Sequence, residues 1–218
     1  MNLICISDLH GDQIPPADLP DGDVLVIAGD VLTDEYNPRI SRHIIQMRFF
    51  DEVWKPYLKA LGERFPHVLW IAGNHDFFLE SISDRRVQAR MPPGVHYLEE
   101  SSIVLDGVKF YGAPWNMTMG WAFALDDEPA QAAKLGDIPT DIDVLIVHGP
   151  PKVDGMPGFH WTSQALGDWV SVTPLKAVIC GHIHEAYGTY AIGDTPVYVV
   201  SSKNRNYELV NPPVEIEI

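Results

Sequence analysis

Five short apolar segments limit what this chain of 218 residues can fold into. Each is four or five residues long and rich in Val, Ile and Leu, without the alternation of polar and apolar residues that marks a strand with one exposed face. Continuous apolar runs of this length are typical of strands that are covered on both faces. The segments are residues 3–7, 24–28, 68–72, 144–147 and 177–180.

Further strands are expected over residues 103–105, 108–111, 188–192 and 197–201. Asp106-Gly107 lies between two of them and predicts a two-residue hairpin, and Gly193-Asp194 predicts a second turn of this kind. Residues 214–218 alternate strictly between apolar residues and Glu, which predicts a half-exposed strand at the edge of a sheet.

Helical patterns separate the early strands. Asn37-Pro38 offers an N-cap followed by proline, and an apolar stripe runs from Ile40 to Leu61 with a break or kink expected at Pro56. Shorter helices are expected over residues 81–90, 128–135 and 163–170. Strand–helix–strand units followed by hairpins predict a layered α/β fold with sheets inside and helices outside. Because no repeat or low-complexity linker interrupts the pattern, one domain over residues 1–218 is expected.

The charge balance argues against a nucleic-acid-binding surface. Thirty Asp and Glu residues face only fifteen Lys and Arg, for a formal net charge of −15, whereas phosphate backbones are held by clustered basic residues. No stable nucleic-acid binding is therefore expected. No apolar run approaches the 18 or so residues of a membrane span, and the first residues lack a signal-peptide pattern. Cys5 and Cys180 lie in apolar segments, as thiols of a reducing compartment do, so we expect a cytoplasmic protein that does not bind membranes.

A polar group follows each of the five apolar segments. The segments end in "SDLHG", "AGD", "AGNHD", "HGPP" and "CGHIH". Ligands bind where parallel strands of α/β sheets end, so these side chains are expected to meet. Four imidazoles, two carboxylates and one amide suit a pair of divalent transition-metal ions, with Asp30 able to bridge them. The candidate metal ligands are Asp8, His10, Asp30, Asn74, His148, His182 and His184.

Each candidate ligand also has an ordinary structural alternative. An aspartate alone serves as a helix cap or turn acceptor, an asparagine after glycine as a left-handed turn residue, and a histidine as a surface or hydrogen-bonded core residue. Seven such alternatives at the same end of five strands form an improbable coincidence, so the joint pattern favours a metal site.

The ordered set D-x-H, GD, GNHD, H-G and GHxH resembles the calcineurin-like metallophosphoesterase superfamily, from Asp8 to His184. "GAPWN", "HGPP", "GHIHEAYG" and the closing "NPP" resemble its small metallophosphoesterase-domain branch, which includes the brain protein 239-like proteins. The resemblance implies a four-layer α/β/β/α sandwich with two central sheets.

The resemblance also implies roles for individual residues. One ion would be held by Asp8, His10, Asp30 and His184, and the other by Asp30, Asn74, His148 and His182. His75 matches the family's catalytic histidine. Asp76 either orients His75 or has a turn or capping role. Two divalent ions are expected as cofactors, with manganese first and iron, zinc, cobalt or nickel as alternatives.

Two departures from the family pattern affect the interpretation. Residues 159–167, including His160, occupy a place where relatives often carry a glycine-cysteine pair. The "GD" motif continues as Val31-Leu32-Thr33-Asp34 and not as the "DRG" of the protein serine/threonine phosphatases, which argues against that activity. Trp115 and Asn116 are candidates either for the substrate cleft or for core packing.

The expected function is hydrolysis of phosphate esters by a hydroxide that bridges the two ions. The absence of a long insertion between the motifs and the scarcity of Lys and Arg favour small phosphodiesters, cyclic or nucleotide-like, as the substrate partner. The alternatives are a phosphomonoesterase of the same fold and a non-catalytic metal-binding scaffold.

Overall fold

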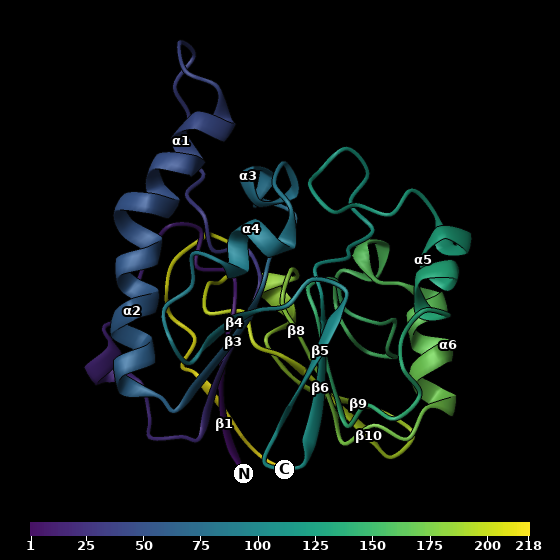
Figure 1. Cartoon of the computed structure of the whole chain (residues 1–218). Coiled ribbons are helices and arrows are strands. Elements are labelled where there is room, and N and C mark those ends of the chain that lie inside the picture. Colours follow the sequence, from purple (N-terminus) through teal and green to yellow (C-terminus); the bar gives the residue numbers. More distant parts are fainter.

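The computed structural model describes residues 1–218, except for the side chain of Phe159. A first sheet has the strand order β11-β1-β2-β3-β4 (Figure 1). Its strands β1 to β4 are parallel, and β11 pairs antiparallel with β1 at the edge, as expected for the alternating C-terminal segment. The bounds are β1 Asn2–Ile6, β2 Val24–Ala28, β3 His67–Ile71, β4 Val95–Tyr97 and β11 Val214–Glu217.

A second sheet has the order β5-β6-β7-β8-β10-β9, with β6, β7, β8 and β10 parallel to one another. The antiparallel strands β5 and β9 are joined to their neighbours by the two expected hairpins, and both Asp106 and Gly107 adopt the positive φ of a tight two-residue turn. The bounds are β5 Ser101–Leu105, β6 Val108–Ala113, β7 Val144–Val147, β8 Ala177–Cys180, β9 Gly188–Ile192 and β10 Thr195–Val199.

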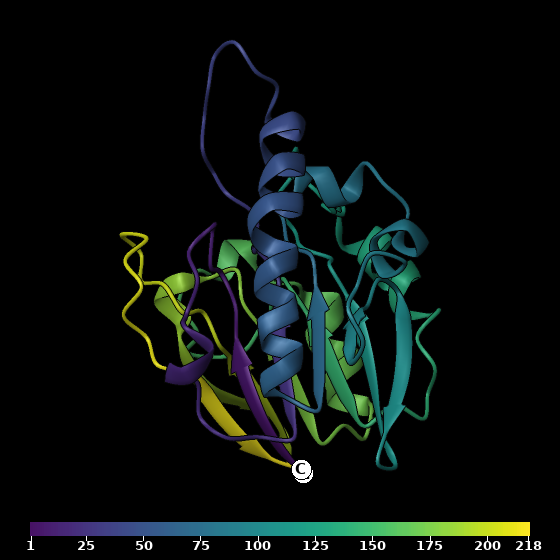
Figure 2. The same ribbon diagram turned by 60° about the vertical axis from the view of Figure 1, so that its left-hand side comes forward.

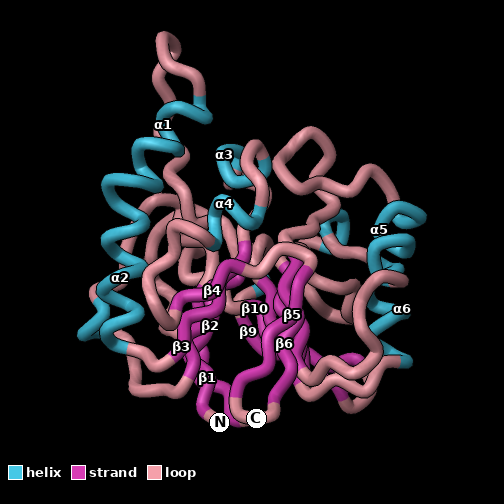
Figure 3. The backbone as a smooth tube through the Cα atoms, viewed as in Figure 1, coloured by secondary structure: helices cyan, strands magenta, loops and turns pink.

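Helices cover the outer faces of both sheets (Figures 1 and 3). On the first sheet, α1, a π-helical segment and α2 form one rod (Figure 2). On the second sheet lie α5 and α6, while the short α3 and α4 lie above the first sheet. The bounds are α1 Arg42–Phe49, π-helix Phe50–Trp54, α2 Lys55–Arg64, α3 Phe77–Glu80, α4 Asp84–Gln88, α5 Glu128–Leu135 and α6 Gln164–Val172, with 3-10 turns at Pro16–Asp18, Phe159–Trp161 and His184–Ala186.

Two helix expectations need correction. Ser41, and not Asn37, is the N-cap of α1. The rod also does not break at Pro56, because the preceding residues widen into the π-helical segment and Pro56 falls in the first turn of α2, where a missing N–H matters least.

Three apolar clusters lie between the four layers and explain the continuous apolar runs. Successive side chains of a strand point to opposite faces. In β1, Ile4 packs toward the helices of the first sheet, whereas Leu3 packs between the two sheets. In β8, Val178 packs toward the helices of the second sheet and Ile179 packs between the sheets. The expected four-layer α/β/β/α sandwich is confirmed.

The two sheets are joined where their parallel strands end. An isolated parallel bridge links Ser7, after β1, with Ser201, after β10, and Ser202 donates its backbone N–H to Ser7 O at 2.9 Å. The loops after β1, β2 and β3 therefore meet the loops after β7, β8 and β10, at the edge opposite the two termini (Figure 1). None of the helices in the described part of the chain is both long and apolar enough to cross a bilayer.

Candidate metal centre

The loops at the joined edge turn sharply to direct polar side chains inward. Asp8, His10, Asp30 and His182 all have left-handed backbones, with φ between 47° and 71°. Residues other than glycine adopt this conformation at a cost of about 1–3 kcal/mol each, and such strain collects at functional sites.

Glycines in these loops provide space as well as conformational freedom. A Cβ atom on Gly73 would collide with Asp30 Oδ1, and one on Gly181 would collide with Ser7 Oγ and Asp8 Oδ2. The motif glycines therefore let the backbone pass close to the carboxylates, which a side chain would prevent.

A first group of donor atoms consists of Asp8, His10 and His184. The Nε2 atoms of His10 and His184 are 3.2 Å apart, and His184 Nε2 lies 3.7 Å from Asp8 Oδ1. All three ligand atoms lie within 4.8 Å of one another and all three residues are buried. Two imidazoles and a carboxylate at these distances can hold one metal ion.

A second group consists of Asn74, His148 and His182. Asn74 Oδ1 lies 2.9 Å from His148 Nε2 and 2.8 Å from His182 Nδ1. Asp30 lies between the two groups, because its Oδ2 is 3.3 Å from His148 Nε2 and 3.8 Å from His10 Nε2. The structure thus brings together all seven candidate ligands, with Asp30 in contact with an imidazole of each group.

The outer ring nitrogen of each imidazole has its own hydrogen-bond partner. Such contacts fix the orientation of a ring and leave the other nitrogen free for a metal. The pairs are His10 Nδ1 with Asp34 Oδ2 at 2.9 Å, His148 Nδ1 with Ala28 O at 2.9 Å, His182 Nε2 with Thr118 Oγ1 at 3.0 Å, and His184 Nδ1 with Asn204 O at 3.0 Å. Asp34, Thr118 and Asn204 are not among the site residues predicted from the sequence, although Asp34 lies four residues after Asp30 and Thr118 lies two residues after the "GAPWN" motif.

The electrostatics of the site favour a bound cation. Asp8 is 0% exposed and Asp30 is 2% exposed, and within the described part of the chain neither forms an ion pair with Lys or Arg. Burial opposes ionisation of Asp30, but the adjacent His148 holds the pKa of Asp30 well below its usual range. Burial likewise opposes protonation of His148, but the charge of Asp30 raises the pKa of His148 to about 9. The buried carboxylate of Asp30 therefore attracts positive charge, here a proton on His148, and a metal ion can supply that charge in place of the proton.

The imidazole of His182 is neutral, so no second proton has to leave the ring before a metal ion binds. Burial, followed by the charge of His148, lowers the pKa of His182 to about 3. Because metals bind the neutral imidazole, His182 is ready to act as a ligand, and the donor set as a whole fits a pair of divalent ions.

His75 lies at the open side of the two groups. Its ring packs edge-on against His10, with centroids 4.6 Å apart, and its backbone N–H donates to Asp30 Oδ1 at 2.7 Å. Its Nδ1 lies 2.7 Å from Asp34 Oδ1. Burial would lower the pKa of His75, but the hydrogen bond to Asp34 and the charges of Asp30 and Asp34 raise it. Asp34 therefore connects His75 to His10.

Of the two roles considered for Asp76, orientation of His75 falls instead to Asp34, whose carboxylate contacts the His75 ring. The Asp76 carboxylate is buried and accepts hydrogen bonds from the backbone N–H groups of Leu32 and Gly73 at 2.8 Å and Val31 at 3.1 Å. Burial and the charge of Asp30 raise the pKa of Asp76 to about 7. Asp76 thus ties the loop after β2 to the loop after β3, in line with its alternative role as a turn residue.

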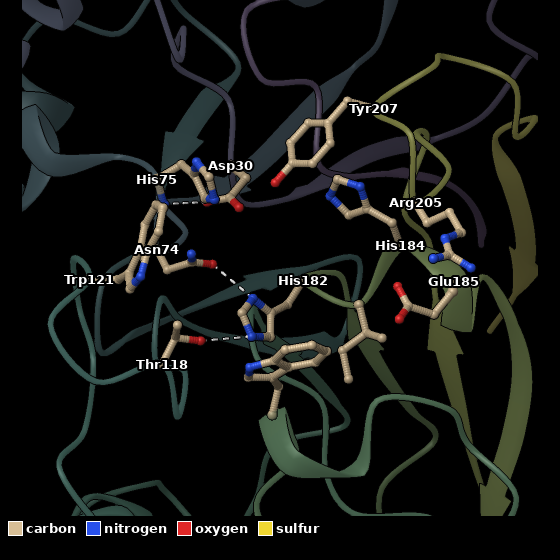
Figure 4. Close-up of a pocket in the computed structure, with 12 residues that line it drawn as sticks. Asp30, Asn74, His75, Thr118, Trp121, His182, His184, Glu185, Arg205 and Tyr207 are labelled. Carbon is tan, nitrogen blue, oxygen red and sulfur yellow. Dashed lines mark hydrogen bonds between the residues drawn. The ribbon is translucent and has the colours of Figure 1, made fainter. Parts of the chain in front are cut away.

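An open pocket of about 460 Å³ lies in front of the donor groups (Figure 4). His75, His182 and His184 form part of its floor. Trp121, Trp161 and Tyr207 line its walls and are 37%, 46% and 49% exposed. Trp161 comes from the atypical 159–167 segment, whose His160 lies in the same 3-10 turn.

Trp115 and Asn116, the two candidates for the cleft, are core residues. Trp115 is buried in the cluster beneath the second sheet's helices, and its Nε1 donates to Glu100 Oε1 at 2.9 Å. Asn116 Nδ2 donates to Ala122 O at 2.9 Å and so shapes the loop that carries Trp121.

Comparison with known proteins identifies the family. The family model for the calcineurin-like phosphoesterases matches residues 1–186. The chain belongs to the calcineurin-like phosphoesterase family. It is 30% identical over 249 residues to "Metallophosphoesterase domain-containing protein 1" of Homo sapiens, covering 99% of this chain and 70% of that protein. It is 26% identical over 230 residues to "UPF0046 protein K07C11.7" of Caenorhabditis elegans, covering 98% and 74%.

A solved structure shares this fold. The protein TT1561 of Thermus thermophilus superimposes with a TM-score of 0.62 at 14% identity, covering 91% of this chain and 88% of that one. Membership of the calcineurin-like phosphoesterase family, together with the Asp and His groups, supports a metal-dependent hydrolase of phosphate esters. The resemblance noted in the sequence is confirmed.

The different roles of Asp76 and Asp34 are testable by stability. Asp76→Asn places amide hydrogens against backbone N–H donors in a buried site, so we expect the free energy of unfolding to fall by about 1–3 kcal/mol. Asp34→Asn, at a carboxylate that is partly exposed, should change it by less than about 1 kcal/mol. Urea unfolding followed by circular dichroism in the presence of a chelator measures both, and equal losses in the two variants would contradict the distinction.

Proposed function

We propose that this protein hydrolyses small phosphodiesters, cyclic or nucleotide-like, with two divalent ions held by the seven strand-end residues. One ion is assigned to Asp8, His10, Asp30 and His184, and the other to Asp30, Asn74, His148 and His182. The observation that carries the proposal is the position of Asp30 between two groups of nitrogen and oxygen donors at the floor of an open pocket.

Bound divalent ions would supply charge neutralisation for the phosphoryl oxygens and a more acidic attacking water. The mixed nitrogen and oxygen ligands suit manganese, which we propose as the working metal, and also iron, zinc, cobalt and nickel.

His75 is proposed as the catalytic residue of the chain. The hydrogen bond between its Nδ1 and Asp34 fixes the ring and leaves Nε2 available on the pocket side. From there, His75 would donate a proton to the leaving-group oxygen or a hydrogen bond to a phosphoryl oxygen, a contribution of roughly 10²–10⁴-fold in general acid catalysis. Asp34 is the positioning residue for this histidine.

The pocket walls favour a diester over a monoester. Among the described residues that line the pocket, Arg205 is the one Lys or Arg, and Glu185 lies on the same side (Figure 4). A dianionic monoester would therefore find little positive charge beyond that of the ions. The three exposed aromatic side chains offer apolar surface for a second ester arm, which a monoester lacks.

A comparison of two aryl esters tests this function. With saturating manganese, bis(p-nitrophenyl) phosphate should be hydrolysed with kcat/KM at least equal to that of p-nitrophenyl phosphate. A preference for the monoester of about a hundredfold would contradict the diesterase and support a phosphomonoesterase. Metal binding without hydrolysis of either ester with any of the five metals would support a non-catalytic scaffold.

Substitution of Asp30, the ligand proposed to be shared, should weaken metal binding while the fold is retained. Asp30→Asn is expected to lower the metal content and to abolish hydrolysis, because Asp30 is the one ligand proposed to contact both ions. Elemental analysis after gel filtration gives the metal content, and thermal unfolding with manganese or a chelator gives a second measure. Metal should raise the Tm of the original protein more than that of the variant. Two bound ions and full activity in the variant would refute the bridging role.

The proton-donor role of His75 predicts a dependence on the leaving group. In His75→Ala, kcat should fall most for esters with poorly acidic leaving groups, because these depend most on protonation. Asp34→Asn should show the same trend with a smaller loss, because its amide holds the ring less well. A series of substituted phenyl esters measures the slope of log kcat against leaving-group pKa. An unchanged slope in His75→Ala would contradict the assignment.

A further inference from the structure

The loop between β10 and β11 reaches back over the metal centre although it lies near the C-terminus. We call residues 203–211 the C-terminal loop. Its base is held by the ion pair of Lys203 with Asp12 at 2.8 Å, in which the Lys203 side chain is buried. Its two ends are drawn together by Asn211, whose Nδ2 donates to Ser201 O at 2.9 Å and to Lys203 O at 3.2 Å. The loop is therefore closed and anchored at its base.

Asn204 organises the tip of the C-terminal loop. Its side-chain Oδ1 accepts the backbone N–H groups of Asn206 at 2.9 Å and Glu208 at 3.1 Å, and its backbone O accepts that of Tyr207 at 2.8 Å. Asparagine turns of this kind are stable local structures. The same backbone oxygen accepts the hydrogen bond from His184 Nδ1, so the turn is attached directly to a candidate ligand.

This turn forces Tyr207 into a left-handed backbone, with φ 62°. The strained residue places its ring over the donor groups, with centroids 4.7 Å from His184, 4.9 Å from His10 and 6.5 Å from His75. Aromatic residues rarely adopt this backbone, and the conformation persists here because several hydrogen bonds hold the turn.

The Tyr207 hydroxyl is available to a ligand. It points into the pocket, toward the side where Asp30 and His75 lie (Figure 4). Among the described residues this hydroxyl has no hydrogen-bond partner, although the backbone of the same turn is hydrogen-bonded to Asn204. If packing on the imidazoles were the only role of this residue, a ring without a hydroxyl would serve as well.

We propose that Tyr207 is a catalytic residue whose hydroxyl donates a hydrogen bond to a non-bridging oxygen of the bound phosphoryl group. This assignment rests on the proposed phosphoesterase function and adds to it a second donor, from the C-terminal loop, beside His75. The phenol keeps its proton throughout, and the hydrogen bond strengthens as negative charge grows on the phosphoryl oxygen. Removal of a prepositioned donor of this kind often lowers kcat by about 10²–10³-fold, and a partly exposed donor contributes less.

Tyr207→Phe separates the hydroxyl from the ring, and Tyr207→Ala removes both. In Tyr207→Phe we expect kcat/KM for bis(p-nitrophenyl) phosphate to fall by at least about tenfold, mostly in kcat, with unchanged manganese content. The inhibition constant of orthovanadate, which mimics the phosphoryl group in the transition state, should rise by a similar factor. Tyr36→Phe is the matched control, because Tyr36 is 78% exposed and is not one of the residues lining the pocket.

Three results would overturn the assignment. First, Tyr207→Phe could match the original protein within about twofold in kcat/KM and in vanadate affinity. Any loss of activity in Tyr207→Ala would then reflect the packing of the ring and not the hydroxyl. The variant could lose metal, so that Tyr207 acts by supporting His10 and His184. Tyr36→Phe could show the same loss, so that the effect is not specific to the pocket.

The binding measurement keeps this test separate from that of the proposed function. If the original protein hydrolyses no ester, the phosphoesterase proposal fails, and calorimetric titration of orthovanadate into the manganese-loaded protein still examines Tyr207. Weaker binding to Tyr207→Phe would then support the hydrogen bond, and equal binding would refute it.

Discussion

Two buried carboxylates govern the arrangement of this molecule's functional edge. Asp8 and Asp30 are almost inaccessible to solvent and lie where the two sheets meet. A buried carboxylate is strongly unfavourable unless it is paired and hydrogen-bonded. Here the compensation comes from imidazoles and backbone N–H groups, and the described ion pairs of both carboxylates involve only histidine. The same negative charge makes the edge a place for divalent cations.

The carboxylates also connect loops that are far apart in sequence. Asp8 accepts the backbone N–H of His182 at 3.0 Å, and Asp30 accepts that of His75 at 2.7 Å. The candidate ligands are thus part of the framework that positions one another. Together with the left-handed residues and the close-approach glycines, these contacts make the site preorganised, which is the condition for electrostatic catalysis.

A second set of contacts surrounds the histidines. Asp34 has a particular place in it, because its two oxygens contact His10 and His75 separately. The carboxylate of Asp34 therefore orients both the candidate ligand His10 and the proposed proton donor His75. Burial opposes ionisation of Asp34, but the hydrogen bonds from these two imidazoles lower the pKa of Asp34 below its usual value, so that Asp34 stays ionised as an acceptor.

The sequence by itself determined the fold class, the two hairpins and the seven residues that meet at the strand ends. It did so because continuous apolar runs can be covered only in an interior sheet, and because parallel strands place their C-terminal loops at one edge. Asp106-Gly107 needed no tertiary information, since its turn is a local conformation.

Only the tertiary structure decided which polar groups support the site. Asp76 is the chain neighbour of His75, yet the start of α3 turns its carboxylate toward the loop after β2, and Asp34 takes the contact. Thr118 and Tyr207 reach the histidines from irregular loops, where no periodicity shows the direction of a side chain. Thr118 follows β6 and His182 follows β8, and these strands flank β7 in the second sheet. Their contact, between residues 64 positions apart, depends on the order of strands in that sheet, and no local pattern encodes it.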